Sequence, residues 1–302
     1  MNETYRQHVA ERAASGIPPL PQTAEQATEL CELLKSSPAG EEQAMLALLV
    51  DRVSPGVDPA ASVKATFLTR IAKGEVKCPL IDRQRAVELL GTMLGGYNLM
   101  SLIEFLEVPD LADKAAAALS HTLLIFDHFH HFLALANKGN AAARYVIDSW
   151  SNAEWFTSRP PLPDRIEAVV YRVEGEINTD DLSPAVHAVS RADITRHALT
   201  MGEKRFPGGI AKIHAMRDAG LSVAFVGDVV GTGSSRKSAT NSLLWHIGED
   251  IPYIPNKRRG GVVIGGTIAP IFYNTLEDSG ALPIQCDVSK LAMDQKIVIL
   301  PH

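Results

Sequence analysis

The segment SVAFVGDVVGTGSSRKSATNSLLWHI at residues 222–247 joins a β-rich run to a helical pattern through a glycine-rich loop. Residues Ser222–Val226 have the apolar, β-branched composition of a strand, whereas Ser234–Ile247 has the character of a helix. A strand, a glycine loop and a helix in this order are typical of an α/β domain. We therefore predict an α/β fold for the C-terminal half of the chain.

Strands and helices continue to alternate on both sides of this segment. The other predicted strands are Ile166–Val173, Val262–Ile264, Leu282–Cys286 and Lys296–Leu300, and the other predicted helices are Gly209–Ala219 and Ile268–Asp278. This alternation supports the same fold class over the whole C-terminal half.

The N-terminal half has a different pattern, with apolar residues at helical spacing from Ala24 to about Trp155. The clearest helical segments are Ala24–Leu34, Glu41–Val50, Ala60–Ala72 and Arg83–Leu94. Short connectors rich in proline and glycine separate them, so neighbouring helices should be antiparallel. About five to eight helices fit this length, and consecutive pairs are similar to the two-helix units of HEAT-type stacks.

A linker is predicted at Thr157–Pro163, which contains Pro160, Pro161 and Pro163. Proline stops helix formation and restricts the preceding residue to extended conformations. The expected organisation is therefore an all-α stack over residues 1–158 followed by a β/α domain over residues 159–302, an α + α/β fold class.

Composition narrows the function classes. The chain is 46% hydrophobic and 21% charged, with a formal net charge of −6. This charge provides no general attraction to nucleic acid, so RNA binding would need a local basic patch. The N-terminus lacks the pattern of a secretory signal, and no run approaches the apolar length of a membrane span. We expect a cytoplasmic protein with no membrane association.

No metal site is expected within this chain. Cys31, Cys78 and Cys286 lie far apart in the sequence and lack C-x-x-C spacing, which is typical of reduced, packed thiols. His128 and His131 share a helical face, but no further ligand accompanies them at a fitting spacing.

The glycine loop is the strongest candidate binding site. Gly231 and Gly233 permit a tight turn and close ligand approach, and the helix that follows presents unpaired N–H groups to an anion. Arg236 stands where the dinucleotide motif needs glycine, and the Walker motif also fails here. An arginine suits a carboxylate or phosphate, which favours small polyanionic acids as ligands. The alternative is an ordinary turn with Ser234 or Ser235 as the helix N-cap.

A second candidate stretch is GEINTDDLSPA at residues 175–185, directly after the first predicted strand. Its adjacent acids and proline also fit a simple Asx-type turn at a strand end. Arg191 follows shortly afterwards and by itself would be a solvated surface residue.

Together these motifs resemble the aconitase B family. GTGSSRKSATN, NTDDLSPA, IPNKRRGG and IAPIFYNTLEDSGALPI are similar to its swivel domain, and HVAERAASGIPP, SPAGEE, RVSPGVD, ELLGTMLGGYN and ALSHTLLIFD are similar to its N-terminal part. In that family a HEAT-like domain and a swivel domain precede three domains that hold an iron–sulfur cluster. The resemblance covers nearly the whole chain and implies a HEAT-like helical stack followed by an aconitase-type swivel domain.

The resemblance also implies an activity and its residues. The family interconverts citrate and isocitrate through cis-aconitate, and often also handles 2-methylisocitrate. Its S-S-R motif falls on Ser234, Ser235 and Arg236, with Ser234 at the position of the base, and its substrate-binding arginine falls on Arg191. Asp180 matches the family's aspartate, although Asp181 follows where many aconitases have histidine.

The family's [4Fe–4S] cluster is expected in domains that this chain lacks, and none is expected to bind here. The sequence ends at Pro301 and His302, before the family's swivel domain would be complete. We therefore expect a piece of a larger enzyme, inactive alone, or a shortened relative that works with cluster-bearing domains. The alternatives are a non-catalytic module for protein or RNA binding, with homodimerisation through the helical domain, and a stand-alone small subunit like that of isopropylmalate isomerase.

Overall fold

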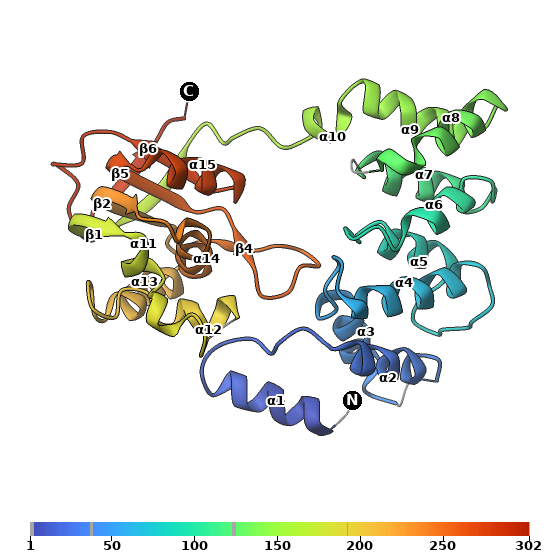
Figure 1. Ribbon diagram of the computed structural model, residues 1–302, viewed down its shortest axis with the longest axis horizontal. Helices are drawn as coiled ribbons and strands as arrows, with labels where there is room; N and C mark the ends of the chain where they lie inside the picture. The colour runs from blue at the N-terminus through green and yellow to red at the C-terminus, as the bar shows by residue number, and fades with distance from the viewer. Residues whose placement is uncertain (1–2, 37–38, 123–124, 192, 302) are drawn as a thin grey trace. The chain divides into compact units, whose positions relative to one another are not determined.

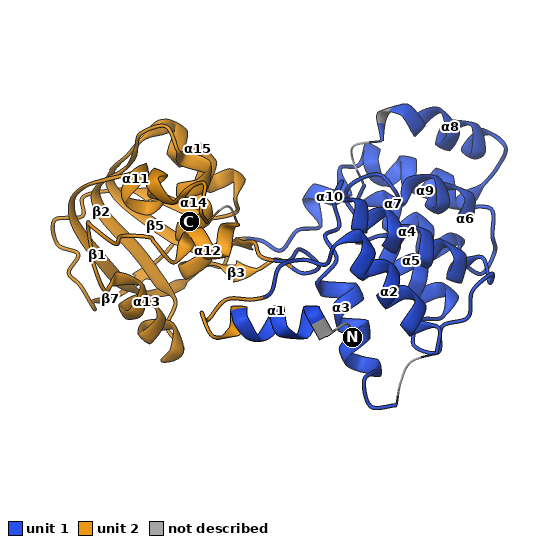
Figure 2. Cartoon of the chain, turned by 60° about the horizontal axis from the view of Figure 1, so that its bottom comes forward, with its two compact units in different colours: residues 1–11, 19–161, 252–255 blue, residues 12–18, 162–251, 256–302 orange. Residues whose placement is uncertain are grey.

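A computed structural model gives the fold of residues 3–36, 39–122, 125–191 and 193–301. Its contacts divide the chain into two compact units, which are coloured separately in Figure 2. The helical unit comprises residues 1–11, 19–161 and 252–255, and the β/α unit comprises residues 12–18, 162–251 and 256–302. The α + α/β fold class is confirmed. The long run of the helical unit ends at Pro161, inside the expected linker, and the boundary at 158/159 stays a prediction.

The helical unit is a series of short helices. They are α1 (Glu3–Ala13), α2 (Ala24–Leu34), α3 (Glu42–Asp51), α4 (Pro59–Ala72), α5 (Arg83–Leu90), α6 (Leu99–Phe105), α7 (Ala112–Ser120), the 3-10 turn η1 (Phe126–His128), α8 (Phe129–Asn137), α9 (Ala141–Ser151) and α10 (Glu154–Thr157). The described part of Ala24–Thr157 thus holds nine α-helices, one more than the largest expected number, because the four-residue α10 adds a turn before the linker.

Polar caps fix where several of these helices begin. Thr23 forms a capping box with Gln26 at the start of α2. The side chains of Asp58, Asp82 and Asn140 accept backbone N–H groups at the starts of α4, α5 and α9, at 2.7 to 2.8 Å. Each such cap contributes about 1 kcal/mol to helix stability.

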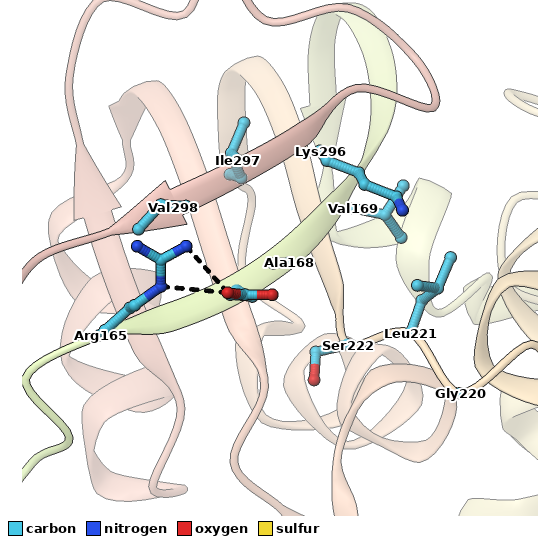
Figure 3. A pocket seen from close by; sticks show the side chains of 10 residues that line it. Arg165, Ala168, Val169, Gly220, Leu221, Ser222, Lys296, Ile297 and Val298 are labelled. Atoms are coloured by element: carbon cyan, nitrogen blue, oxygen red, sulfur yellow. Dashed lines mark hydrogen bonds and ion pairs between the residues drawn. The ribbon is translucent and has the colours of Figure 1, made fainter.

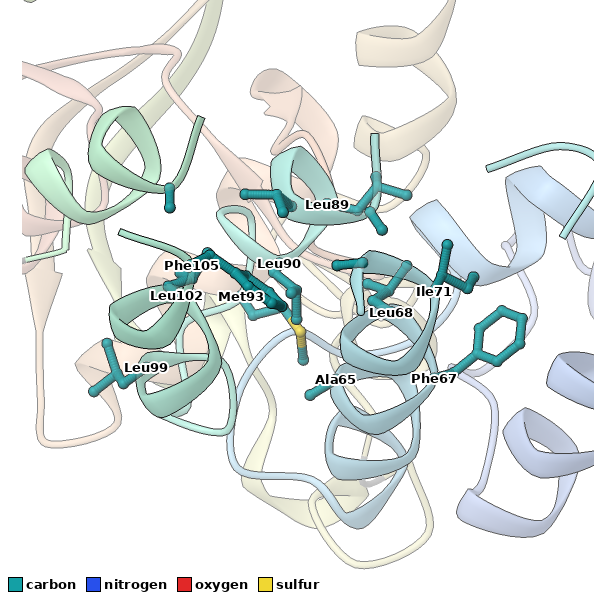
Figure 4. Packing of buried hydrophobic residues seen from close by; sticks show 14 of the residues in the cluster. Ala65, Phe67, Leu68, Ile71, Leu89, Leu90, Met93, Leu99, Leu102 and Phe105 are labelled. Carbon is teal, nitrogen blue, oxygen red and sulfur yellow. The ribbon is translucent and has the colours of Figure 1, made fainter. Parts of the chain in front are cut away.

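Packing between successive helices forms a continuous apolar core. Figure 4 shows a central part of it, where Phe67 and Leu68 of α4, Leu89 and Leu90 of α5, and Leu102 and Phe105 of α6 are buried together. Each fully buried side chain of this size contributes about 1.5–3 kcal/mol through removal of apolar surface from water.

The helix predicted to extend to Leu94 ends earlier, at Leu90. The chain turns there, and the Leu94 backbone N–H donates to Pro55 O at 2.8 Å. A Cβ atom at Gly95 would clash with the Gly56 carbonyl, so the two connectors approach as closely as glycine allows. This tertiary contact outweighs the local helical pattern.

The β/α unit is built on a five-stranded sheet with the strand order β6-β5-β2-β1-β7, of which Figure 1 labels the first four strands and Figure 2 labels β7. The strands are β1 (Ile166–Asn178), β2 (Val223–Thr232), β5 (Val262–Ile268), β6 (Leu282–Gln285) and β7 (Lys296–Ile299), with a separate pair β3 (Glu249–Asp250) and β4 (Arg258–Arg259). Within the five-stranded sheet, neighbouring strands are parallel except β7, which is antiparallel to β1, and the separate pair β3 and β4 is antiparallel. The helices of this unit are α11 (Thr179–Leu182), the 3-10 turn η2 (Ala185–His187), α12 (Ile194–Ala198), α13 (Gly209–Asp218), α14 (Arg236–Ile247) and α15 (Pro270–Asp278).

Both faces of this sheet are buried. Helices α13, α14 and α15 pack against β2, over a core that includes Tyr171, Phe225 and Phe272. The opposite face carries a smaller cluster that includes Val170 and Val226. Two-sided burial explains the near-continuous apolar sequence of the central strands.

Strands β1 and β2 are longer than the sequence predicted. A bulge interrupts β1 between Val173 and Glu176, after which pairing with β2 resumes and continues to Asn178↔Thr232. Gly175 within the bulge has φ +76°, and its N–H donates to Asp228 at 2.5 Å. The strand therefore continues through a polar, glycine-containing stretch that composition alone assigns to a turn.

Among the described helices, none is long and apolar enough to cross a membrane.

Candidate active site

The two motifs singled out in the sequence meet at one edge of the sheet. Strands β1 and β2 are parallel, so their carboxyl ends lie side by side, and Asn178 is paired with Thr232. The turn NTDDLSPA leaves β1 at this point, and the loop GTGSSRK leaves β2. Open α/β sheets bind ligands at this kind of edge.

Gly231, near the end of β2, and Gly233, just after it, are required by both the backbone conformation and the space available. Their φ angles are +82° and +111°, in the region that favours glycine. A Cβ atom at Gly231 would clash with Phe272, and one at Gly233 would clash with the hydroxyl of Thr179. The loop therefore passes close to α15 and α11 before it enters α14.

The first turn of α14 has free hydrogen-bond donors. Ser235 occupies the N-cap position, but no side chain caps the backbone there. Ser234 and Ser235 are exposed, and in the described part of the chain neither hydroxyl has a hydrogen-bond partner. The alternative with Ser235 as the helix N-cap is therefore correct for its position, but Ser235 makes no side-chain capping bond. The backbone N–H groups and the positive end of the helix dipole are available to an anion.

Positive charge accompanies these donors. Residues Ser234–Ser238 line a shallow hollow of about 440 Å³. Within it, the Arg236 guanidinium donates to the Ser234 carbonyl at 3.2 Å, which holds it over the loop, and Lys237 is exposed beside it. The first turn of α14 contains no acidic residue. The hollow is thus suited to a carboxylate or phosphate group.

Asp180 and Asp181 have different positions on the short turn α11. Asp181 belongs to a capping box, in which it accepts the Asn178 N–H at 2.9 Å and donates its own N–H to the Asn178 side chain at 2.8 Å. Asp180 is exposed and accepts the Ala185 N–H through one oxygen at 2.7 Å. Asp181, which stands where many aconitases have histidine, therefore holds the turn, and Asp180 keeps a second oxygen for other contacts.

Arg191 lies on the segment between η2 and α12. Its backbone N–H donates to His187 O at 2.9 Å, and the His187 ring contacts the Glu203 carboxylate at 2.9 Å. The helix that follows this segment, α12, packs against α14, the helix that the glycine loop enters. No hydrogen bond or ion pair joins the Arg191 guanidinium to Ser234 or Arg236 within the described residues.

Sequence reasoning missed several side chains that shape the loop. The Thr232 hydroxyl donates to Glu176 at 2.5 Å. The buried Thr179 packs so closely against Gly233 that no larger residue fits there. Asp228 accepts the Gly175 N–H and pairs with Arg172, and these contacts lower the pKa of the Asp228 carboxyl. Thr232, Glu176 and Thr179 lie within the two quoted motifs, but the sequence alone did not reveal their roles, because each role depends on a partner in another element.

The cysteines and histidines do not fit a metal cluster. Cys31 and Cys78 belong to the helical unit and Cys286 to the β/α unit. Burial raises the pKa of the Cys31 thiol to about 12, which disfavours the thiolate that a metal needs. The His128 and His131 rings are stacked, with centroids 5.8 Å apart. Among the described residues, no three His, Cys, Asp or Glu side chains form a metal-binding group. The residues that the structure describes therefore do not fit as ligands of an iron–sulfur cluster.

A second hollow, of about 420 Å³, lies near the amino ends of β1 and β2 (Figure 3). Its lining mixes charges, since Arg165 pairs with Glu167 at 2.9 Å and Lys296 lies nearby on β7. It is also at the end of the sheet opposite to the one that binds ligands in open α/β folds. The carboxyl-end site remains the stronger candidate.

A mostly parallel sheet with an uncapped helix N-terminus and an arginine at its carboxyl edge is the arrangement of an α/β domain suited to an anionic ligand. Comparison with known families is more specific. Residues 4–156 match the model described as aconitate B N-terminal domain, and residues 168–302 match the model described as aconitate hydratase 2 N-terminus. The chain belongs to the aconitate hydratase B family, and matches its N-terminal region.

Individual relatives agree with this assignment. The chain is 59% identical to aconitate hydratase B of Synechocystis sp., over 100% of this chain and 35% of the relative. It is 55% identical to the proteins of the same name from Pseudomonas aeruginosa and Escherichia coli, over 100% of this chain and 36% of each relative. The chain thus spans about a third of the length of these relatives.

Proposed function

We propose that this chain forms one wall of the active site of an aconitate hydratase, a hydro-lyase that interconverts citrate and isocitrate through cis-aconitate. The observation that carries the proposal is the uncapped first turn of α14, where free N–H groups lie beside Ser234 and Arg236. Identity of 51–59% to proteins named aconitate hydratase B supports this choice of reaction.

Ser234 is the proposed general base. Dehydration requires removal of a weakly acidic proton from a carbon next to a carboxylate, while a hydroxyl group leaves the neighbouring carbon. The Ser234 Oγ would accept that proton. A serine oxygen is a weak base in water, so this role depends on stabilisation of its negative charge by the helix N-terminus and by Arg236.

Arg236, Ser235 and Arg191 are the proposed carboxylate-binding groups. A guanidinium can bind a carboxylate through two parallel hydrogen bonds, which fixes orientation as well as charge. The exposed Ser235 hydroxyl can donate a further bond to the same group. Arg191 would hold a second carboxylate, since its guanidinium has no partner within the described residues.

Asp180 is proposed to contribute through its remaining carboxylate oxygen, either to substrate or to a group from another domain of the complete protein. Other substrates with the same arrangement of carboxylates, such as 2-methylisocitrate, would bind to the same carboxylate-binding residues. We also propose that the [4Fe–4S] cluster of the complete enzyme is bound by domains outside this chain, which supplies no ligand set among its described residues.

The test is complementation. The chain is combined with separately expressed cluster-bearing domains of a relative, and formation of cis-aconitate from citrate and from isocitrate is measured. We expect activity only from the mixture, with neither part active alone and a mixture with the Ser234→Ala chain strongly impaired.

If the cluster is present and the two parts bind each other but the mixture is inactive, the proposal is contradicted. If such a mixture instead binds RNA or another protein, a non-catalytic binding module is favoured. The net charge of −6 gives no general support to RNA binding, so the enzymatic proposal takes precedence.

A further inference from the structure

The segment Arg12–Pro18 belongs to the β/α unit although it lies near the N-terminus of the chain. Its anchor is Arg12, of which 4% is exposed. The guanidinium binds Asp193 through two parallel hydrogen bonds, with Nη1 to Oδ2 at 3.0 Å and Nη2 to Oδ1 at 2.9 Å. It also donates to Thr195 Oγ1 at 2.5 Å and to Pro18 O at 2.9 Å.

This bridge differs from the other ion pairs in the described part of the chain because it is buried and bidentate. The Arg12 side chain is 5% exposed and that of Asp193 is 24% exposed, whereas Arg6 and Glu41, also paired, are 45% and 39% exposed. Bidentate pairs fix geometry as well as charge, and removal of one partner from a buried pair leaves the other charge uncompensated.

Asp193 transmits this anchoring to the start of α12. It is the N-cap residue of that helix and accepts the Arg196 N–H at 3.0 Å and the Thr195 hydroxyl at 2.6 Å. Burial alone would raise the pKa of the Asp193 carboxyl, but the hydrogen bonds from Arg12, Thr195 and the Arg196 backbone outweigh burial and lower it to about 2. Asp193 is therefore ionised, and the bridge is intact, throughout the physiological pH range.

Arg191 lies close to this anchor. It precedes Asp193 by two residues, so the two Cα atoms are at most about 7.6 Å apart. On its other side the backbone is held by the bond from the Arg191 N–H to His187 O. The Arg191 backbone thus has a hydrogen bond on one side and lies two residues from the anchored Asp193 on the other, while the Arg191 guanidinium has no partner among the described residues.

We propose that Arg12 is a positioning residue, whose buried bridge to Asp193 sets the backbone from which Arg191 reaches a substrate carboxylate. This inference rests on the proposed function, in which Arg191 is a carboxylate clamp. It gives a role to the N-terminal motif HVAERAASGIPP, which the proposed chemistry does not otherwise use.

The test uses the complete enzyme that carries this chain and compares Arg12→Gln, Arg12→Lys and Arg191→Lys. We expect Arg12→Gln to raise KM for isocitrate about tenfold with a smaller change in kcat, because a displaced clamp weakens ground-state binding. Arg12→Lys keeps the charge but loses the two-pronged bridge, and should be intermediate. Arg6→Gln is the matched control on the same helix, and should leave KM unchanged.

A double-mutant cycle separates positioning from a purely structural role. If Arg12 acts through Arg191, the KM effects of Arg12→Gln and Arg191→Lys should be strongly less than additive. Suppose that Arg191→Lys raises KM. The inference is then overturned if the KM effects of the two variants are additive, or if a folded Arg12→Gln enzyme has an unchanged KM. An unchanged KM for Arg191→Lys would instead remove the clamp from the proposed function. If Arg12→Gln does not fold, Arg12→Lys and the charge-neutral pair Arg12→Gln with Asp193→Asn take its place in the cycle.

Discussion

At the scale of single residues, Ser234 and Arg236 have roles that kinetics can separate. Both lie at the start of α14, but one would act on a proton in transfer and the other on a carboxylate that is already bound in the ground state. A base contributes mainly to kcat, whereas a clamp also contributes to KM.

Replacing Ser234 by Ala in the complete enzyme should lower kcat about 10²–10⁴-fold and change KM little, because general-base catalysis contributes gains of this size. Steady-state kinetics with isocitrate provide the measurement, and Ser279→Ala, at the end of α15, is a control remote from the loop. A near-normal kcat for Ser234→Ala would show that another group removes the proton.

Replacing Arg236 by Lys should raise KM about tenfold along with a fall in kcat, since lysine keeps the charge but not the planar pair of donors. The affinity for tricarballylate, a tricarboxylate with no hydroxyl to lose, should weaken in parallel when measured by calorimetry. If that affinity is unchanged, Arg236 does not bind a substrate carboxylate.

At the scale of elements, α14 is held in place by a pair of histidines. The buried His246 contacts Ala198 O of α12 through Nε2 at 2.8 Å, and its Nδ1 contacts His214 Nε2 of α13 at 3.0 Å. The Ala198 carbonyl can only accept, so His246 carries its proton on Nε2 and His214 donates to Nδ1. These bonds tie three helices together behind the glycine loop.

This arrangement predicts a pH dependence of stability. Burial, with lesser effects from its neighbours, lowers the pKa of His246 from 6.5 to about 4. Below about pH 6.5 the unfolded chain takes up a proton that the folded chain does not, so stability is lost as the pH falls from about 6.5 to 4, by up to about 3 kcal/mol. Chemical denaturation from pH 7.5 to 4 should show this slope.

The variant His246→Gln should flatten the slope, because glutamine can donate to Ala198 O but does not titrate. The exposed His130 of the helical unit provides the control, and His130→Gln should keep the slope. An unchanged pH dependence for His246→Gln would place the titrating group elsewhere.

Elements formed by contacts between residues close in sequence could be predicted, whereas those that depend on distant residues could not. The helix Ala24–Leu34 and the strand, loop and helix around Gly231 could be predicted, because their signals are local. The extension of β1 beyond its bulge depends on Asp228, on another strand. The bridge from Arg12 to Asp193 spans 181 residues of sequence, and neither partner belongs to a local pattern that would reveal it.

At the scale of the whole molecule, the chain spans about a third of the length of its relatives, and the helical unit exposes apolar side chains. One exposed apolar group in the helical unit is Val57, Leu94, Tyr97 and Met100, which are 79%, 68%, 44% and 47% exposed. Two hydrogen bonds hold this group together: the Leu94 N–H donates to Pro55 O, and the Tyr97 hydroxyl donates to Val57 O. An exposed cluster of this kind favours association.

We predict that this cluster mediates self-association of the chain. Sedimentation equilibrium of the 302-residue chain should show dimers at high concentration, and the double variant Val57→Ser with Leu94→Ser should weaken dimerisation at least about tenfold, since each change removes an apolar side chain from the contact. Leu300→Ser, which alters an equally exposed leucine of the β/α unit, is the control and should leave the dimer intact. The intact chain is the appropriate sample, because cutting it at the linker would separate Arg12 from Asp193. A chain that stays monomeric at every concentration, or a dimer that only Leu300→Ser weakens, would contradict an association surface on the helical unit.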